Sequence, residues 1–282
     1  MISIIIVNHD GGEVLLRTLG ELEALAARSP QPPWQQLLLV DNASTDGSRE
    51  QVRSRFPAVD VLALERNHGF GAAMNRGAAA ARGDRLLLLN SDAWPLPGAV
   101  ERLDAALDAD PRLALVAPML RYPDGRRQFH WAPSTGVAGE AVQKLRNHFE
   151  GTAWVHRVRP PLLHRWYTAA FLLVRREAFE QVGGFDESFL LYFEDADLCL
   201  RLREAGWRLG DVLAAEAIHV KGGSQPARDA LGSVEYRRSQ LLYYAKHRPA
   251  WENRYLRRRL RRRLCEISDP ARRAAWEALL RT

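Results

Sequence analysis

The sequence predicts an α/β fold in which a mostly parallel central sheet is flanked by helices, with further helices at the C-terminus. Two observations support this prediction. Four successive leucines, Leu86 to Leu89, describe a strand that is buried on both faces, as in a parallel sheet. The preceding residues alternate between apolar strand-like runs and segments of helical periodicity, which is the pattern of parallel strands joined by crossover helices.

The elements of residues 1–117 follow one another in a regular order. Ile2 to Val7 is an apolar, β-branched run that predicts the first strand. Leucines recur every three or four residues between Glu13 and Ala27, which predicts a helix. The same reasoning predicts strands over 36–40 and 59–64, helices over 48–56, 72–82 and 98–109, and a short strand over 114–117.

The pattern is less regular in the second half of the chain. Between residues 120 and 167 it dissolves into Pro, Gly, Arg, His and Trp, so we expect a long functional loop there. Order returns after this loop. Strands are predicted over 169–174 and 212–220, and helices over 176–182, 196–205, 233–247 and 250–264.

Composition narrows the class of protein. With 46% hydrophobic and 26% charged residues the chain is an ordinary globular protein. Its two cysteines, Cys199 and Cys265, are far apart, so we expect reduced thiols and a cytoplasmic setting. The apolar start is short and lacks a basic leader, and no run of about 18 apolar residues exists, so we expect neither a signal peptide nor a membrane span.

The net charge of +6 is located in the C-terminal tail. Residues 248–282 hold 11 arginines against 4 acidic residues, a surplus of 7 that leaves the body near neutral. A near-neutral body without a recognisable module argues against nucleic acid as a partner. Trp251, Tyr255 and leucines recur at helical steps among the arginines. Two alternatives remain open: this apolar stripe lies in an anionic membrane interface, or it packs on the protein itself.

Polar side chains follow four successive strands, at the point where each strand ends. Each group by itself is compatible with turn chemistry. Carboxyl ends of parallel strands share one edge of the sheet, however, so together they predict a nucleotide site. The glycine pair Gly69 and Gly71 is weak evidence for a dinucleotide fold, because the third glycine is missing. The four groups are Asn8–Asp10, Asp41–Asp46, Asn67–Gly71 and Asn90–Asp92.

A second polar cluster lies between Gly183 and Asp197. Three carboxylates, Glu194, Asp195 and Asp197, fall within four residues and follow Tyr192 and Phe193. Acidic residues are also favoured at the start of any helix, so a structural explanation is available. An apolar environment and a neighbouring like charge both raise a carboxyl pKa, and this strengthens a general base.

These motifs, taken together and in order, resemble the family 2 inverting glycosyltransferases, especially their rhamnosyltransferase-like branch. The similarity extends over about residues 2–247 and implies a GT-A fold. It implies a nucleotide-sugar-binding half at 1–117, an acceptor-binding and catalytic half at 118–232, and a basic helical tail at 233–282. The segments that carry it are 3–8, 40–48, 67–70, 89–92, 183–187, 194–198 and 206–207.

The resemblance also assigns roles to individual residues. It implies that Asp195 is the catalytic base, with Glu194 as the alternative. Asp92 matches the last acid of the family's Asp-x-Asp signature and is expected to hold Mg²⁺ or Mn²⁺ together with His219, although a polar residue at a strand end would also explain this histidine. His9 stands where a tyrosine that packs on the base is usual. The expected nucleotide-sugar contacts are Asn8, His9, Asp41, Asn67, Asn75, Ser91 and Asp92.

The implied function is metal-dependent transfer of a sugar from a nucleoside diphosphate donor, with dTDP-rhamnose expected first. The acceptor would be a hydroxyl of a saccharide or lipid-linked saccharide in cell-surface polysaccharide synthesis. The alternative is a catalytically silent nucleotide-sugar or glycan-binding module. We expect the protein in the cytoplasm, either free or peripheral at the inner face of the cell membrane. In the loop 120–167, Trp131, Trp154, Trp166 and Tyr167 either stack on sugar rings or anchor the loop.

Overall fold

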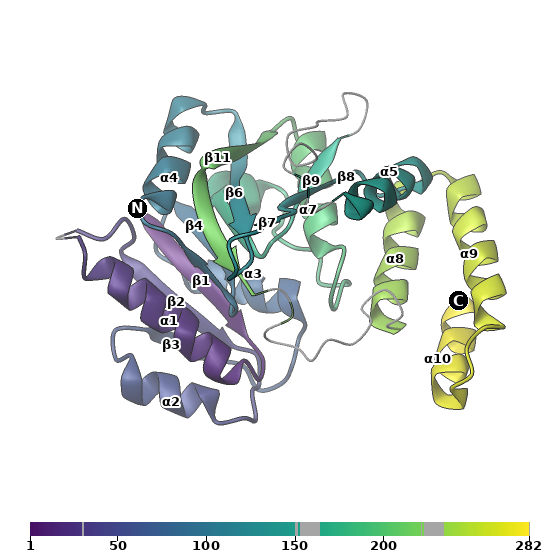
Figure 1. Cartoon of the computed structure of the whole chain (residues 1–282), viewed down its shortest axis with the longest axis horizontal. Coiled ribbons are helices and arrows are strands. Elements are labelled where there is room, and N and C mark those ends of the chain that lie inside the picture. Colours follow the sequence, from purple (N-terminus) through teal and green to yellow (C-terminus); the bar gives the residue numbers. More distant parts are fainter. Residues whose placement is uncertain (30, 150–151, 153–163, 221, 223–233, 282) are drawn as a thin grey trace.

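The computed structural model describes residues 1–29, 31–149, 152, 164–220, 222 and 234–281 (Figure 1). Within these residues the central sheet has nine strands. Their order is β3-β2-β1-β4-β10-β6-β11-β5, with β7 paired to β6. The strands are β1 (Ile2–Asn8), β2 (Gln36–Asp41), β3 (Asp60–Ala63), β4 (Arg85–Asn90), β5 (Ala93–Pro95), β6 (Leu113–Arg121), β7 (Arg127–Gln128), β10 (Phe171–Arg175) and β11 (Arg208–His219).

The first four strands of the sheet are parallel, which confirms the predicted α/β class. Asn8 at the end of β1 lies beside Asp41 at the end of β2. On the other side of β1, Val7 pairs with Asn90 of β4. Crossover helices join these strands: α1 (Gly12–Ala26), α2 (Ser48–Arg55) and α3 (Phe70–Ala80). The polar groups that follow these strands therefore do meet at one edge of the sheet.

The leucine run of β4 is buried on both faces, as predicted. Leu87 and Leu89 belong to a core on one face, under α1 and α4 (Ala99–Ala109). Leu86 and Leu88 belong to a core on the other face, under α3, α6 (Arg176–Gln181) and α7 (Glu194–Glu204). A strand covered by helices on both sides has no place for polar side chains except at its ends.

The strand β10 runs antiparallel to β4, and this reversal brings the two halves of the chain together. Phe171 pairs with Leu89, so the start of β10 lies at the carboxyl end of β4. The N–H of Asn90 donates to the carbonyl oxygen of Ala170 at 3.1 Å. The loop that precedes β10 is thereby fixed next to the Asn90–Asp92 turn.

The stretch 120–167, predicted as an irregular loop, contains regular structure. It includes β7, β8 (Trp131–Pro133) and α5 (Val137–His148), and β8 pairs with β9 (Arg165–Tyr167) in a separate two-stranded sheet. Periodicity did not reveal α5 because its contacts are mostly polar. Only Gly139 and Arg146 of α5 are buried, and Leu145 is exposed.

Three helices make up the C-terminal tail: α8 (Val234–His247), α9 (Ala250–Leu264) and α10 (Pro270–Arg281). They stand beside α5 and α7, at the end of the molecule remote from α1 and α2 (Figure 1). Leu256 and Leu260 of α9 pack in a core with α8 and α10, so packing on the protein itself is confirmed for these two leucines. The sequence had not predicted α10, which contributes Trp276 and Leu280 to that core. No helix in the described ranges combines the length and apolarity needed to cross a membrane.

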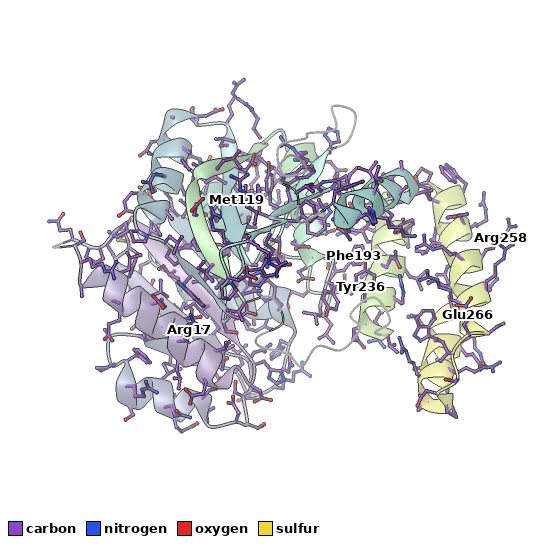
Figure 2. The ribbon with its side chains drawn as sticks, in the orientation of Figure 1. Arg17, Met119, Phe193, Tyr236, Arg258 and Glu266 are labelled. Carbon is purple, nitrogen blue, oxygen red and sulfur yellow. The ribbon has the colours of Figure 1, made fainter. Side chains whose placement is uncertain are left out.

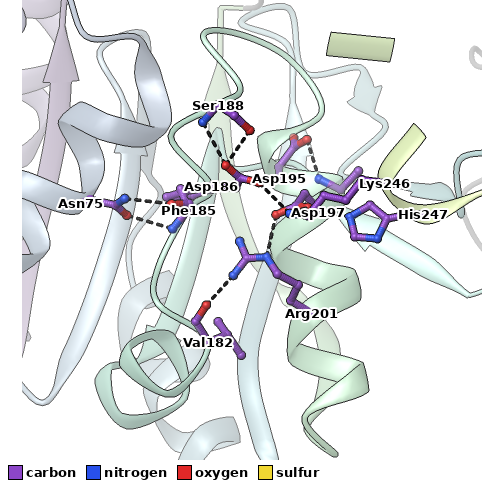
Figure 3. Close-up of polar contacts among 11 residues, drawn as sticks. Asn75, Val182, Phe185, Asp186, Ser188, Asp195, Asp197, Arg201, Lys246 and His247 are labelled. Carbon is purple, nitrogen blue, oxygen red and sulfur yellow. Dashed lines mark hydrogen bonds and ion pairs between the residues drawn. The ribbon is translucent and has the colours of Figure 1, made fainter. Parts of the chain in front are cut away.

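A buried carboxylate connects this tail to α7. Asp197 is fully buried and accepts hydrogen bonds from Arg201, Lys246 and His247, each at 2.6 Å (Figure 3). Burial alone would raise the pKa of Asp197, but the bonds from His247 and Lys246 outweigh it and the pKa is lowered. The ionised carboxylate therefore contributes to the stability of the junction between α7 and α8.

Replacing Asp197→Asn should lower the free energy of unfolding by about 3 kcal/mol at pH 7, because removing one partner leaves buried cations uncompensated. Asp186→Asn is the matched control, since Asp186 contacts the same Lys246 at 2.6 Å but is more exposed. It should cost less than about 1 kcal/mol. Urea denaturation gives both values.

The effect of Asp197 also has a defined pH dependence. Its pKa is lowered on folding, so its contribution is complete above the ordinary carboxyl value of 3.8 and is lost as the pH falls below it. The difference between wild type and Asp197→Asn should shrink accordingly. Equal stabilities of Asp197→Asn and Asp186→Asn at pH 7 would contradict this account.

Candidate active site

The nucleotide-side residues form a bonded cluster at the ends of β1 and β2. The Asn8 side-chain amide donates to Asp41 at 3.3 Å, and also to the hydroxyls of Ser44 (2.9 Å) and Ser48 (3.0 Å). Arg49, at the start of α2, lies 3.6 Å from the buried Asp41 carboxylate. This cluster holds Asp41 in a fixed position with a cation beside it. Sequence reasoning missed Arg49, because a lone arginine in a first helical turn carries no signal.

Asn67 joins the same edge through a second asparagine. Asn42 donates to the side-chain oxygen of Asn67 at 2.9 Å and accepts from the N–H of His68 at 2.9 Å. His9 is exposed at the end of β1, next to Asn8. The structure thus brings Asn8, His9, Asp41 and Asn67 to one edge, where a nucleotide was expected.

The predicted metal residues, Asp92 and His219, lie together. Both are buried, and His219 Nε2 is 3.3 Å from Asp92 Oδ1. The strand β11 delivers His219 to this place by pairing with β5, where His219 lies opposite Ala93. Ser91 is buried beside Asp92, and its carbonyl accepts from the Thr18 hydroxyl at 2.9 Å.

Gln128 determines which nitrogen of His219 faces Asp92. Its side-chain NH₂ donates to the backbone carbonyl of His219 at 3.4 Å, which turns Gln128 Oε1 toward His219 Nδ1 at 2.6 Å. An acceptor at that distance calls for a proton on Nδ1, and Nε2 is the ring nitrogen that faces the carboxylate. Nothing in the sequence around Gln128 indicated this role.

The donor set fits a divalent cation that is completed by substrate. A carboxylate oxygen and an imidazole nitrogen are ligands for Mn²⁺ and, for the oxygen, Mg²⁺. Their separation of 3.3 Å is close to the spacing of about 3 Å between adjacent ligands of an octahedral ion with bonds of about 2.1 Å. Among the described residues no group of three His, Cys, Asp or Glu side chains gathers. Phosphate and water oxygens would have to supply the other ligands.

A cavity of about 350 Å³ opens beside this edge. The end of β4 provides Asn90, and the loop before β10 provides Thr168, Ala169 and Ala170. Among the described lining residues none is basic, and the acids are Glu140, Glu194 and Asp195. Its aromatic and aliphatic walls come from Phe70, Trp166, Leu191, Tyr192, Phe193 and Tyr236.

The two predicted catalytic acids lie at the start of α7, in the wall of this cavity. Asp195 accepts from the N–H of Ala169 at 3.4 Å and from the N–H of Ala196 at 2.8 Å. Glu194 is buried, and its Oε2 has no hydrogen-bond partner among the residues that the structure describes. The two acids therefore differ in environment: Asp195 accepts from two backbone N–H groups, whereas Oε2 of Glu194 accepts from none among the described residues.

These environments separate the pKa values of the pair. Burial raises the pKa of Asp195 to about 6. The bonds from backbone N–H groups lower this pKa and so offset part of the effect of burial. Burial and, after it, the neighbouring Asp195 charge raise the pKa of Glu194 to about 8. Both pKa values are raised, and that of Glu194 is raised further because it has the weaker hydrogen bonding and the neighbouring charge. Asp195 is therefore the better candidate for the group that accepts a proton.

The backbone that leads into α7 is held in an unusual conformation. Tyr192 and Phe193 both have left-handed φ values, 70° and 67°. Such strain persists only where surrounding contacts enforce it, and it concentrates at functional sites. One enforcing contact is the turn before α3: the N–H of Phe70 donates to the Leu190 carbonyl at 3.1 Å. At Gly69 a Cβ would lie 2.4 Å from that oxygen, which explains the glycine.

Asn75, an expected nucleotide contact, is bonded to the loop between α6 and α7. Its amide donates to the Phe185 carbonyl at 2.9 Å and accepts from the Phe185 N–H at 2.8 Å (Figure 3). It therefore holds the loop between α6 and α7 against α3. The aromatic residues of the stretch 120–167 were expected either to stack on sugar rings or to anchor a loop. Trp131 and Tyr167 are buried in the core, and Trp166 lines the cavity. Trp154 lies outside the described residues.

Comparison with known proteins identifies the family. A family model described as glycosyl transferase family 2 matches residues 3–183. The N-acetylglucosaminyl-diphospho-decaprenol L-rhamnosyltransferase of Mycobacterium tuberculosis is 32% identical over 93% of this chain and 89% of its own length. The rhamnosyltransferase WbbL of Escherichia coli is 52% identical over 54 residues, 19% of this chain and 20% of its own length.

The fold agrees with solved glycosyltransferase structures. The mannosyltransferase PcManGT of Pyrobaculum calidifontis, solved with GDP-Man and Mn²⁺, superposes with a TM-score of 0.60 at 16% sequence identity. The match covers 99% of this chain and 73% of that one. The predicted GT-A fold and rhamnosyltransferase-like resemblance are both confirmed. The chain belongs to glycosyltransferase family 2 and is a glycosyltransferase.

Proposed function

We propose that this enzyme transfers rhamnose from dTDP-rhamnose to a hydroxyl of a lipid-linked saccharide, with inversion at the anomeric carbon. The observation that carries the proposal is the position of Asp195 in the wall of an apolar cavity, fixed through Ala169 and Ala170 beside the Asn90–Asp92 turn. The Mycobacterium tuberculosis relative, whose name specifies a lipid diphosphate acceptor and rhamnose, supports the choice of substrates.

The two halves of the chain would bind different substrates. Residues 1–117 would bind the donor at the strand ends that carry Asn8, Asp41 and Asp92. Residues 118–232 would bind the acceptor sugar in the cavity, where aromatic walls suit a sugar ring and the absence of described basic lining residues suits a neutral one. A lipid-linked acceptor would place the enzyme at the cytoplasmic face of a membrane.

The chemical step follows from the position of the base. Asp195 accepts the proton of the acceptor hydroxyl as that oxygen forms a bond to the anomeric carbon. The bond from that carbon to the donor diphosphate breaks at the same time, and the diphosphate leaves with the electron pair. A single displacement inverts the centre. Glu194, whose pKa is raised further, would hold its proton and keep a second negative charge away from the base.

The residues that would hold Mg²⁺ or Mn²⁺ are Asp92 and His219. A divalent cation there would supply the positive charge that the leaving diphosphate needs. Gln128 would keep His219 Nε2 available as a ligand by holding Nδ1. The PcManGT structure contains Mn²⁺, and this supports a metal at the corresponding edge of the fold.

Asp92→Ala should abolish metal-dependent donor binding and leave the fold intact. With Mn²⁺ present, dTDP-rhamnose at about 100 times its Kd should stabilise the wild type by about 2.7 kcal/mol, which raises Tm by several degrees. The variant should show no such rise in a thermal-shift assay. Asp124→Ala, which removes an exposed carboxylate, is the control and should respond as wild type does. An unchanged, metal-dependent rise in Asp92→Ala would show that Asp92 is only a turn residue.

Asp195→Asn should reduce kcat by about 10²-fold or more while donor affinity stays nearly unchanged, because a general base is lost. Glu194→Gln is the matched variant and should lose far less, since Glu194, whose pKa is raised further, would already hold its proton. A large loss confined to Glu194→Gln would move the base by one residue.

The pH profile tests the same assignment. Since the pKa of Asp195 is raised to about 6, kcat/KM should climb as the pH increases through that value and the carboxyl ionises. The residual activity of Asp195→Asn should lack this rise. A rise that survives in the variant would belong to another group.

A further inference from the structure

The helix α9 presents two chemically different sides. Its inner side carries Glu252, Leu256 and Leu260, all buried, and the two leucines pack against α8 and α10. The side chains of Trp251 and Tyr255 are 55% and 47% exposed, so they lie on the outer side. The structure thus separates the aromatic residues from the leucines, which the sequence had grouped in one stripe.

The outer side of α9 is both aromatic and basic. Residues three, four, seven and eleven positions apart share a helix face, which places Trp251, Arg254, Tyr255, Arg258 and Arg262 together. All five are exposed. Figure 2 shows Arg258 pointing away from the rest of the molecule. We call these five residues the outer face of α9.

The arginines of this face differ from those on the inner side. Arg259 turns inward and pairs with Glu140 at 2.8 Å. Within the described ranges, Arg254, Arg258 and Arg262 form no ion pair, and Glu252, the sole acid of α9, is buried against Arg248. The outer face therefore carries uncompensated positive charge beside two exposed aromatic rings.

We propose that the outer face of α9 docks on an anionic lipid surface. Tyr and Trp favour the boundary between water and lipid, since one part of each ring is apolar and the other polar. Basic residues are attracted to anionic headgroups and act within a Debye length of them. A helix with both features lies flat in the interface, and exposure of the aromatic rings is what this contact requires.

The inner side of α9 connects this surface to the cavity. Glu140, which lines the cavity, accepts from Arg259 of α9 and from Gln240 and Tyr244 of α8. Glu252 of α9 accepts from the N–H of Val137, at the start of α5. The outer face is therefore joined to the cavity wall through the inner side of α9 and its contacts with α5. Docking would hold the cavity close to membrane-embedded acceptors, a consequence that rests on the proposed function.

Vesicle co-sedimentation of the full chain, without donor or acceptor, tests the docking itself. Wild type should bind vesicles containing phosphatidylglycerol at low salt, bind weakly at high salt, and bind poorly to pure phosphatidylcholine. Combining Arg254→Gln, Arg258→Gln and Arg262→Gln should weaken binding roughly 100-fold, since each arginine contributes about fivefold near an anionic surface. Trp251→Ser with Tyr255→Ser should weaken it at high salt as well.

The matched control removes three arginines from the opposite end of the molecule. Arg28→Gln, Arg53→Gln and Arg55→Gln lie at exposed positions around α1 and α2 and change the net charge equally. This variant should bind as wild type does. Equal weakening by the two triple variants, wild type left in the supernatant at low salt, or arginine-dependent binding to RNA but not to vesicles would overturn the proposal. Asp195→Asn should still bind vesicles, so failure of docking and failure of catalysis are distinguishable.

Discussion

The buried carboxylate of Asp197 fixes the helix on which the catalytic site depends. Arg201 from its own helix and Lys246 and His247 from α8 converge on it. Asp197 thereby fixes α7 and joins it to α8 of the tail. With α7 held in this way, the two preceding acids lie in the cavity wall instead of facing solvent. Their raised pKa values are a consequence of that placement.

The same placement explains the strain and the glycines around it. Tyr192 and Phe193 adopt left-handed backbone because the chain must turn from Leu190, which contacts Gly69, into the start of α7. Gly69 was part of a glycine pair that suggested a phosphate loop only weakly, and the structure assigns it to close packing between the two halves. The turn before α3 and the segment before α7 therefore meet over backbone contacts, where a side chain would separate them.

Much of the fold could be predicted because its signals are local. The four leucines of β4 and the polar ends of β1, β2 and β4 follow from strand chemistry, and parallel strands must bring those ends together. What could not be predicted depends on contacts distant in sequence. The helix α5 is held in place by hydrogen bonds with Glu252 and with residues of α8. Such a helix needs no apolar stripe, so its sequence gives no helical hydrophobic pattern. Gln128 acts on His219 from 91 residues away, and no periodic pattern reports such a pair.

The stereochemistry of the product tests most directly whether Asp195 acts as the base of a single displacement. The product formed from dTDP-rhamnose and a lipid-diphosphate saccharide can be examined by NMR, because the configuration of its new glycosidic bond is fixed once that bond has formed. We predict that its new glycosidic bond has the anomeric configuration opposite to that of the donor, because a single displacement with Asp195 as the base forms no covalent intermediate. A product of retained configuration would contradict both the role of Asp195 and the mechanism built on it.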